Sequence, residues 1–168
     1  MDQMLTYEAL LFPADGRPPH LVGLTTSLDA ISTSEYYSGR VQATRIPHPE
    51  VYMDYIAEIG SRAWQYHPVH ALDGMSKNLP NPYAIFYPVI SRDGMPFPVN
   101  KCVKEIQGKN FREETAWRGN LVVAKFTDTT YTAMVDASMA DFPLIKNYLL
   151  THHSPVKVSR RSLQFLPA

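Results

Sequence analysis

Stretches rich in β-branched and aromatic residues, separated by clusters of Gly, Pro, Asn, Asp and Ser, predict several short strands. They occupy residues 5–12, 20–25, 40–46, 83–90, 121–126 and 131–136. The first two are expected to pair across the turn-rich loop 13–19, and the last two around residues 127–130. Pro88 predicts that its strand is an edge strand or carries a bulge, because proline cannot donate to a ladder.

Apolar residues recur at helical spacing after Pro47-His48-Pro49. Proline is tolerated in the first turn of a helix, where its missing N–H costs nothing. The stripe consists of Tyr52, Tyr55, Ile56, Ile59 and Ala63. We therefore expect a helix that begins near residue 49 and continues to about Tyr66.

Two further helices are predicted from their capping residues. Asn100 is expected to cap a short helix over residues 101–107, closed by Gly108. Ser138 and Asp141 have the spacing of a capping box, and the residues after them predict a final helix. Its apolar face consists of Phe142, Ile145 and Leu149.

Strands and helices interleave without a regular βαβ rhythm, which indicates an α+β fold with a mostly antiparallel sheet, two main helices and one short helix. A chain of 168 residues suits one domain. Residues 1–153 are expected to form that domain, and residues 154–168 a basic C-terminal tail.

Charge is unevenly distributed although the net charge is zero. Residues 142–168 contain Lys146, Lys157, Arg160 and Arg161 and no acidic residue. Such a segment is expected to dock on the acidic body or on an acidic partner, or to stay solvated. Four cations are too few to predict nucleic-acid binding, for which a basic domain is typical.

Composition and termini favour an intracellular protein, cytoplasmic or nuclear. Cys102 is the single cysteine and cannot form an internal disulfide, which suits a reducing compartment. The N-terminal residues lack the basic and apolar regions of a signal peptide. No apolar run approaches the roughly 20 residues of a membrane span, so no membrane partner is expected.

The run 117–125, Trp-Arg-Gly-Asn-Leu-Val-Val-Ala-Lys, is followed by a short strand and by Asp136 before the last helix. This C-terminal quarter resembles the corresponding end of short uncharacterised proteins of mushroom-forming fungi. The resemblance implies a fungal intracellular protein. It implies no activity, cofactor or site residue.

One group of side chains has the composition of a metal site. His67 and His70 are three residues apart, and Asp73 follows three residues later. Imidazole and carboxylate groups bind zinc and related ions if the segment is helical or tightly turned. Pro68 disfavours that helix, so the alternative is a loop whose histidines form ordinary hydrogen bonds. No cofactor is expected.

Cys102 is the candidate nucleophile. In the first turn of the predicted helix it lies between Lys101 and Lys104, and the helix dipole with two cations is expected to lower the thiol pKa. A catalytic cysteine also needs a base, which only the fold can supply. The alternative is a buried cysteine that packs as a small apolar residue.

Exposed aromatic and basic residues are the candidates for an interface. They are Tyr52, Tyr55, Trp117, Arg160, Arg161 and Phe165. Aromatic side chains with a polar group are enriched at interfaces, although they also suit a core or a ligand pocket. No phosphate loop, nucleophile elbow or dinucleotide fingerprint occurs.

The sequence therefore favours a non-enzymatic module that binds a protein partner or itself. The alternative is a small enzyme or small-molecule-binding protein whose pocket uses Cys102 or the group of His67, His70 and Asp73. Active sites assemble in space, so a missing motif does not exclude that alternative.

Overall fold

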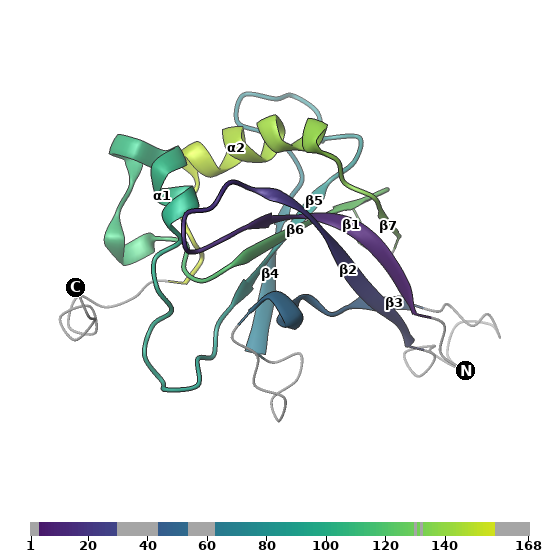
Figure 1. The fold of residues 1–168 in the computed structure, drawn as a ribbon. Coiled ribbons are helices and arrows are strands. Elements are labelled where there is room, and N and C mark those ends of the chain that lie inside the picture. Colours follow the sequence, from purple (N-terminus) through teal and green to yellow (C-terminus); the bar gives the residue numbers. More distant parts are fainter. Residues whose placement is uncertain (1–3, 30–43, 54–62, 130, 132, 157–168) are drawn as a thin grey trace.

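Two three-stranded meanders lie side by side in one antiparallel sheet (Figure 1). The computed structural model describes residues 4–29, 44–53, 63–129, 131 and 133–156. The first meander consists of β1 (Leu5–Phe12), β2 (His20–Asp29) and β3 (Thr44–Pro47). The second consists of β4 (Trp64–Val69), β5 (Tyr83–Pro88) and β6 (Leu121–Phe126). The strand order is β3-β2-β1-β6-β5-β4, and the short β7 (Met134–Val135) pairs with β6.

A seam between β1 and β6 joins the meanders. Three residue pairs form it: Leu10 with Val123, Leu11 with Val122, and Phe12 with Leu121. All described strand pairs are antiparallel, which confirms the predicted α+β fold with an antiparallel sheet.

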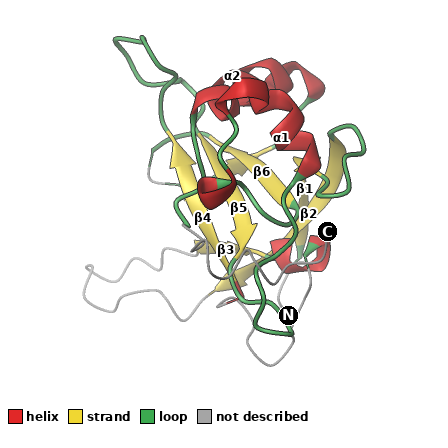
Figure 2. Ribbon diagram, turned by 90° about the vertical axis from the view of Figure 1, so that its left-hand side faces the viewer, coloured by secondary structure: helices red, strands yellow, loops and turns green. Residues whose placement is uncertain are grey.

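Both α-helices of the described chain lie over one face of the sheet (Figure 2). They are α1 (Lys101–Gln107) and α2 (Phe142–Thr151), and their predicted caps are present. The Asn100 side chain accepts a hydrogen bond from the Val103 amide at 2.9 Å. Ser138 and Asp141 form the capping box in a short 3-10 turn, η5 (Met139–Asp141), that leads into α2.

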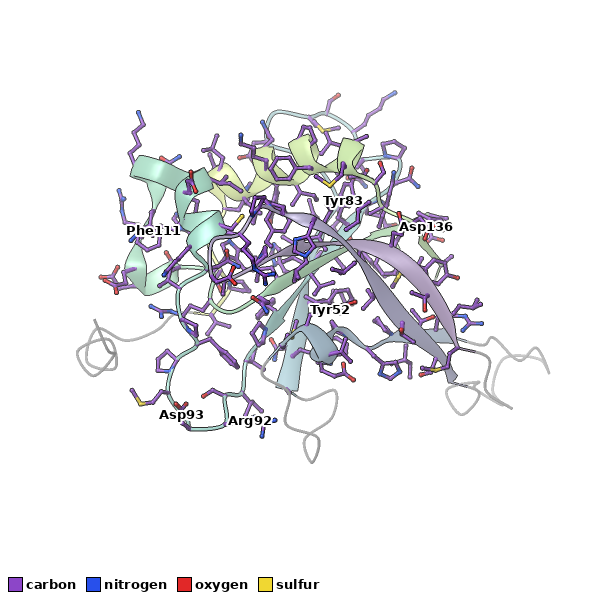
Figure 3. All side chains as sticks on the ribbon, viewed as in Figure 1. Tyr52, Tyr83, Arg92, Asp93, Phe111 and Asp136 are labelled. Carbon is purple, nitrogen blue, oxygen red and sulfur yellow. The ribbon has the colours of Figure 1, made fainter. Side chains whose placement is uncertain are left out.

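The sheet is buried on both faces because it curls. Side chains of a strand alternate between faces. On the face under the helices, the helix face, Tyr83 and Ile85 of β5 pack with residues of α1 and α2. On the opposite side, the inner face, Ala84 and Phe86 join a second apolar cluster. Figure 3 shows the labelled Tyr83 on the helix side of the sheet and Tyr52 on the other.

The predicted long helix is wrong at its C-terminal end. Residues 64–66 belong to β4, which pairs with β5 from Trp64 opposite Pro88 to Val69 opposite Tyr83. The N-terminal end of the prediction is a 3-10 turn, η1 (Pro49–Tyr52). The central residues, 54–62, lie outside the described residues. Trp64 and Tyr66 face the inner side of the sheet, while Val69 belongs to the helix-face cluster. Side chains in this segment therefore alternate between two faces with the period of a strand instead of forming a helical stripe.

The prediction that the strand in residues 83–90 is an edge strand or carries a bulge is also wrong, because β5 pairs with both β4 and β6 in an unbroken register. Pro88 is the last residue of β5, and the pairing with β6 ends at Phe86 opposite Val122. Its missing N–H therefore falls outside that ladder. Two further 3-10 turns, η3 (Gly108–Asn110) and η4 (Glu113–Thr115), connect α1 to β6. In the described part, no helix has the length and apolar character to cross a membrane.

Candidate functional site

The three predicted metal ligands have separate hydrogen-bond partners. His67 Nε2 lies 2.5 Å from the Tyr148 hydroxyl, and His70 Nδ1 lies 3.1 Å from the Tyr131 hydroxyl. Asp73 accepts a hydrogen bond from Thr151 at 3.1 Å. Within the described residues, no group of three or more His, Cys, Asp or Glu side chains is arranged to hold a metal ion. These contacts match the alternative to a metal site, in which the histidines form ordinary hydrogen bonds.

His67 lies on the helix face and is partly buried. Its burial, with the nearby His152 and His70, lowers the pKa of His67, so the ring is neutral at pH 7. His67 thus serves as a hydrogen-bonding group of the packed interior between β4 and α2.

Cys102 is buried against the sheet and is 7% exposed. Burial, with the negative charge of Glu105, raises the pKa of the Cys102 thiol to about 11. The predicted lowering of this pKa is therefore wrong. The dipole of a helix of seven residues and two exposed lysines do not offset the cost of a thiolate in an apolar surrounding.

The predicted interface residues lie in different places. Trp117 is 1% exposed and donates from Nε1 to the His152 carbonyl at 3.0 Å, so it belongs to the core, and its assignment to an interface is wrong. The Tyr52 hydroxyl donates to the Gly23 carbonyl. The predictions for Tyr55, Arg160, Arg161 and Phe165 lie outside the described residues.

A cavity lined mainly by aromatic side chains opens on the inner face, and we call it the aromatic cavity. Its volume is about 180 Å³. It is lined by Arg45, Pro47, Trp64, Tyr66, Ala84, Phe86, Phe126 and Tyr131. These residues come from both edge strands, β3 and β4, from the central strands β5 and β6, and from the segment after β6. The curl of the sheet therefore brings its two edges to one cavity.

The aromatic rings of the cavity contact one another in a continuous series. Trp64 meets Phe86 edge-on with centroids 5.2 Å apart, and Phe86 lies 6.0 Å from Tyr66. Tyr66 lies 6.0 Å from Tyr131, which meets Phe126 edge-on at 5.0 Å. Such tilted and edge-to-face contacts add to the stability gained from burial alone. The cavity wall is therefore held in place by its own side chains.

Tyr131 is under conformational constraint at this cavity. Its φ of 57° lies in the left-handed region, which residues other than glycine seldom adopt. Its hydroxyl contacts His70 and donates to the Tyr83 carbonyl at 3.3 Å. Burial, with the neighbouring Tyr66, raises the pKa of Tyr131 to about 12, so the hydroxyl stays protonated. Strain of this kind, typically 1–3 kcal/mol, clusters at ligand and active sites.

Three side chains form a hydrogen-bonded chain behind Trp64, namely Glu50, His48 and Ser27. Glu50 is 8% exposed, and its carboxylate accepts from Trp64 Nε1 at 2.9 Å and contacts His48 Nδ1 at 3.1 Å. His48 Nε2 lies 2.7 Å from the Ser27 hydroxyl. A carboxylate only accepts, so His48 Nδ1 is the donor in its contact with Glu50; in that tautomer of a neutral imidazole, Nε2 is an acceptor for the Ser27 hydroxyl.

This chain has the order of groups found in serine nucleophile sites, but its position suits a different task. Ser27 pairs with Ile46, and its neighbour Thr26 pairs with Pro47, which lines the aromatic cavity. Because successive side chains alternate, Ser27 lies on the face away from that cavity. The chain therefore orients Glu50 and, through it, the Trp64 indole.

No family model, curated protein or solved structure matches this chain. The aromatic cavity is accordingly defined by geometry. Sequence reasoning missed it because Trp64 and Tyr66 were assigned to the end of a helix. A signal was present in the unbroken apolar runs 83–87 and 121–124, which are typical of strands buried on both faces.

Proposed function

We propose that the protein binds a small molecule that carries one aromatic ring and an acidic group in the aromatic cavity. The observation that carries the proposal is a continuous wall of five aromatic rings around about 180 Å³, with Arg45 in the same wall. Ligand sites are typically apolar and aromatic with a few polar groups that fix orientation. This corresponds to the small-molecule-binding alternative derived from the sequence, with different residues.

The volume sets the size of the ligand. An apolar cavity of about 150 Å³ accommodates benzene. The aromatic cavity, at about 180 Å³, therefore suits a single six-membered ring with a short substituent. Tyr66 is 50% exposed, so the cavity is accessible from solvent on that side.

The polar groups of the wall favour an anionic substituent. Arg45 presents a planar guanidinium with several donors, which matches carboxylates and phosphates. The described wall contains no serine, cysteine, histidine or carboxylate side chain. Binding, rather than nucleophilic catalysis, is the activity that this set of side chains supports.

NMR titration with benzoate, observed through the two tryptophan indole N–H signals, tests the proposal. Trp64 lines the cavity, whereas Trp117 lies in the core under the helices and serves as an internal reference. We expect benzoate to shift the Trp64 signal in a saturable manner and to leave the Trp117 signal in place. Absence of saturable binding, or equal shifts of both signals, would overturn the proposal.

An arginine variant distinguishes the contribution of the ligand's charge to binding from the contribution of its aromatic ring. Arg45→Gln is expected to weaken benzoate binding by about tenfold, because a charge-assisted hydrogen-bond pair is lost. It should leave the binding of uncharged benzyl alcohol unchanged. Arg17→Gln is the matched control, since Arg17 pairs with Asp15 at the exposed turn after β1. Equal effects of the two arginine variants would contradict the assignment of Arg45.

A further inference from the structure

Both edges of the curled sheet reach the aromatic cavity. Among the described strands, β3 and β4 lie at the two ends of the sheet and do not pair with each other. Arg45 and Pro47 of β3 and Trp64 and Tyr66 of β4 nevertheless line the same cavity. An edge strand presents backbone N–H and C=O groups that can pair with another chain. The backbone of an edge is therefore a second set of binding groups beside the aromatic rings.

The register of β4 on β5 shows which of its backbone groups point outward. The Val89 amide donates to the Ala63 carbonyl at 2.9 Å, and these two residues continue the register in which Trp64 lies opposite Pro88. In an antiparallel ladder, hydrogen-bonded pairs alternate with pairs that are not hydrogen-bonded. The odd-numbered residues of β4 therefore bond to β5. Trp64 and Tyr66 direct their N–H and C=O groups to the outer edge.

Two features keep this outer edge short. β4 begins at Trp64. Pro68 is the next residue of β4 whose backbone points outward, and it has no N–H to donate. Within β4, Trp64 and Tyr66 are thus the residues that can each exchange two hydrogen bonds with an added strand. The edge therefore suits a short extended segment, such as the end of a chain.

An added strand would place a side chain in the aromatic cavity. Residues directly opposite each other on neighbouring strands point their side chains to the same face of the sheet. The side chains of Trp64 and Tyr66 line the cavity, so residues paired with them face the cavity as well. Its volume of about 180 Å³ accommodates one six-membered ring with a methylene group, as in phenylalanine.

We propose that this edge binds the C-terminal end of an extended peptide that finishes in phenylalanine. The peptide runs antiparallel to β4, with the phenylalanine opposite Trp64 and its ring in the aromatic cavity. The terminal carboxylate accepts from the Trp64 amide, and the residue two positions earlier pairs with Tyr66. Arg45 in the cavity wall complements the charge of the carboxylate. This inference rests on the proposed function and names a peptide end as the ligand that carries the ring and the acidic group.

NMR titration with acetyl-Thr-Thr-Phe, which has a free C-terminal carboxylate, tests the proposal. We expect saturable shifts of the Trp64 and Tyr66 backbone amide signals. The peptide should bind at least about tenfold more tightly than N-acetylphenylalanine, because it adds the hydrogen bonds to Tyr66. The same peptide with a C-terminal carboxamide should bind at least about tenfold more weakly. Equal affinities in either comparison would overturn the proposal.

Two N-methylated forms of the peptide provide a matched comparison on the unchanged protein. Methylation of the first threonine removes the N–H that donates to the Tyr66 carbonyl, and it should weaken binding at least about tenfold. Methylation of the second threonine alters an N–H that points away from β4, and it should change the affinity by less than about threefold. Equal weakening by both methyl groups would contradict strand addition.

Benzoate distinguishes a failure of this inference from a failure of the proposed function, because it has the ring and the carboxylate and no peptide backbone. If benzoate binds and the peptide binds no better than N-acetylphenylalanine, the proposed function stands and strand addition is wrong. If the two N-methylated peptides differ as expected and benzoate does not bind, strand addition stands and the small-molecule proposal is wrong.

Discussion

Single polar residues hold distant segments of this protein together. Asn100 is fully buried, and its side-chain amide donates to the Phe12 and Gly119 carbonyls at 2.8 Å each. Its oxygen caps α1 at the same time. The sequence predicted the cap, which is a local pattern. It did not predict the two long-range bonds, since their partners lie 88 and 19 residues away.

Asp141 is a second such residue. Its carboxylate accepts from the Tyr83 hydroxyl at 2.5 Å and from the Ser138 amide at 2.7 Å, and it pairs with Lys125 at 3.0 Å. Burial alone would raise the pKa of Asp141, but these hydrogen bonds and the lysine charge lower it. Burial, together with the contact to Asp141, raises the pKa of Tyr83.

This lowered pKa predicts how stability depends on pH. A carboxyl whose pKa is lower in the folded state contributes its full stabilisation above its unfolded pKa, near 3.8, and loses it as pH falls through the folded value. We expect Asp141→Asn to lose about 1–3 kcal/mol of unfolding free energy at pH 7. Its stability should then decrease less steeply than that of the wild type below pH 4, as measured by urea denaturation. Parallel pH profiles would contradict this.

At the scale of elements, α2 is fixed at its C-terminal end by side chains from elsewhere. Gln107 donates from Nε2 to the Leu149 and His152 carbonyls at 3.0 and 2.9 Å. Trp117 also donates to His152, and Asn110 donates to the Leu150 carbonyl at 3.1 Å. The last carbonyls of a helix have no partner within it, so these contacts satisfy groups that would otherwise need water.

Among these contacts, the two hydrogen bonds of Gln107 should contribute most to the free energy of unfolding, apart from the core packing of Trp117. Gln107→Met keeps the side-chain volume and removes both hydrogen bonds, leaving two carbonyls with fewer partners. We expect a loss of about 1–3 kcal/mol in unfolding free energy. The control is Asn110→Ala, which removes one exposed bond and should cost less than about 1 kcal/mol. A larger loss for Asn110→Ala would contradict this ranking.

The predictions of helices and strands were correct where adjacent residues determine the element, and they were wrong where pairing with a distant segment determines it. The hairpin of β1 and β2 and the two capped helices were predicted correctly, because turns and caps are read from adjacent residues. The helix expected through Tyr66 was wrong because β5 pairs with that segment. The apolar runs in β5 and β6 marked a second buried face, but the aromatic cavity itself could not be predicted, since its residues meet only after the sheet curls.

At the scale of the whole molecule, the chain still contacts the domain just after residue 153, where the basic C-terminal tail was expected to begin. The Ser154 amide donates to the Thr115 carbonyl at 3.0 Å, and Ser154 and Val156 line a small cavity together with Arg118. Residues 154–156 are therefore packed on the domain. The segment 157–168, which contains Lys157, Arg160 and Arg161 and no acid, lies outside the described residues.

Association of the chain with itself or with a protein partner through the basic tail 154–168 stays a prediction from the sequence, and residues 157–168 contain three of its basic residues. We expect a chain that lacks residues 157–168 to remain folded and to lose any assembly that the full chain forms. Native mass spectrometry of both proteins measures this, with Arg160→Gln/Arg161→Gln as the control for charge. A full chain that is monomeric at all concentrations would contradict the prediction, and a truncated chain that unfolds would assign the segment a structural role.

The seam between β1 and β6 has a consequence for how the molecule is assembled. Each meander pairs strands that are neighbours in the chain, whereas the seam joins residues about 110 positions apart. Closing so long a loop costs more entropy than closing a hairpin. A chain cut between β3 and β4 leaves each meander whole, and the pairing of β1 with β6 would join the two fragments in the sheet, together with side-chain contacts such as that of Asn100 with Phe12. The topology therefore suits reconstitution from two separately made pieces.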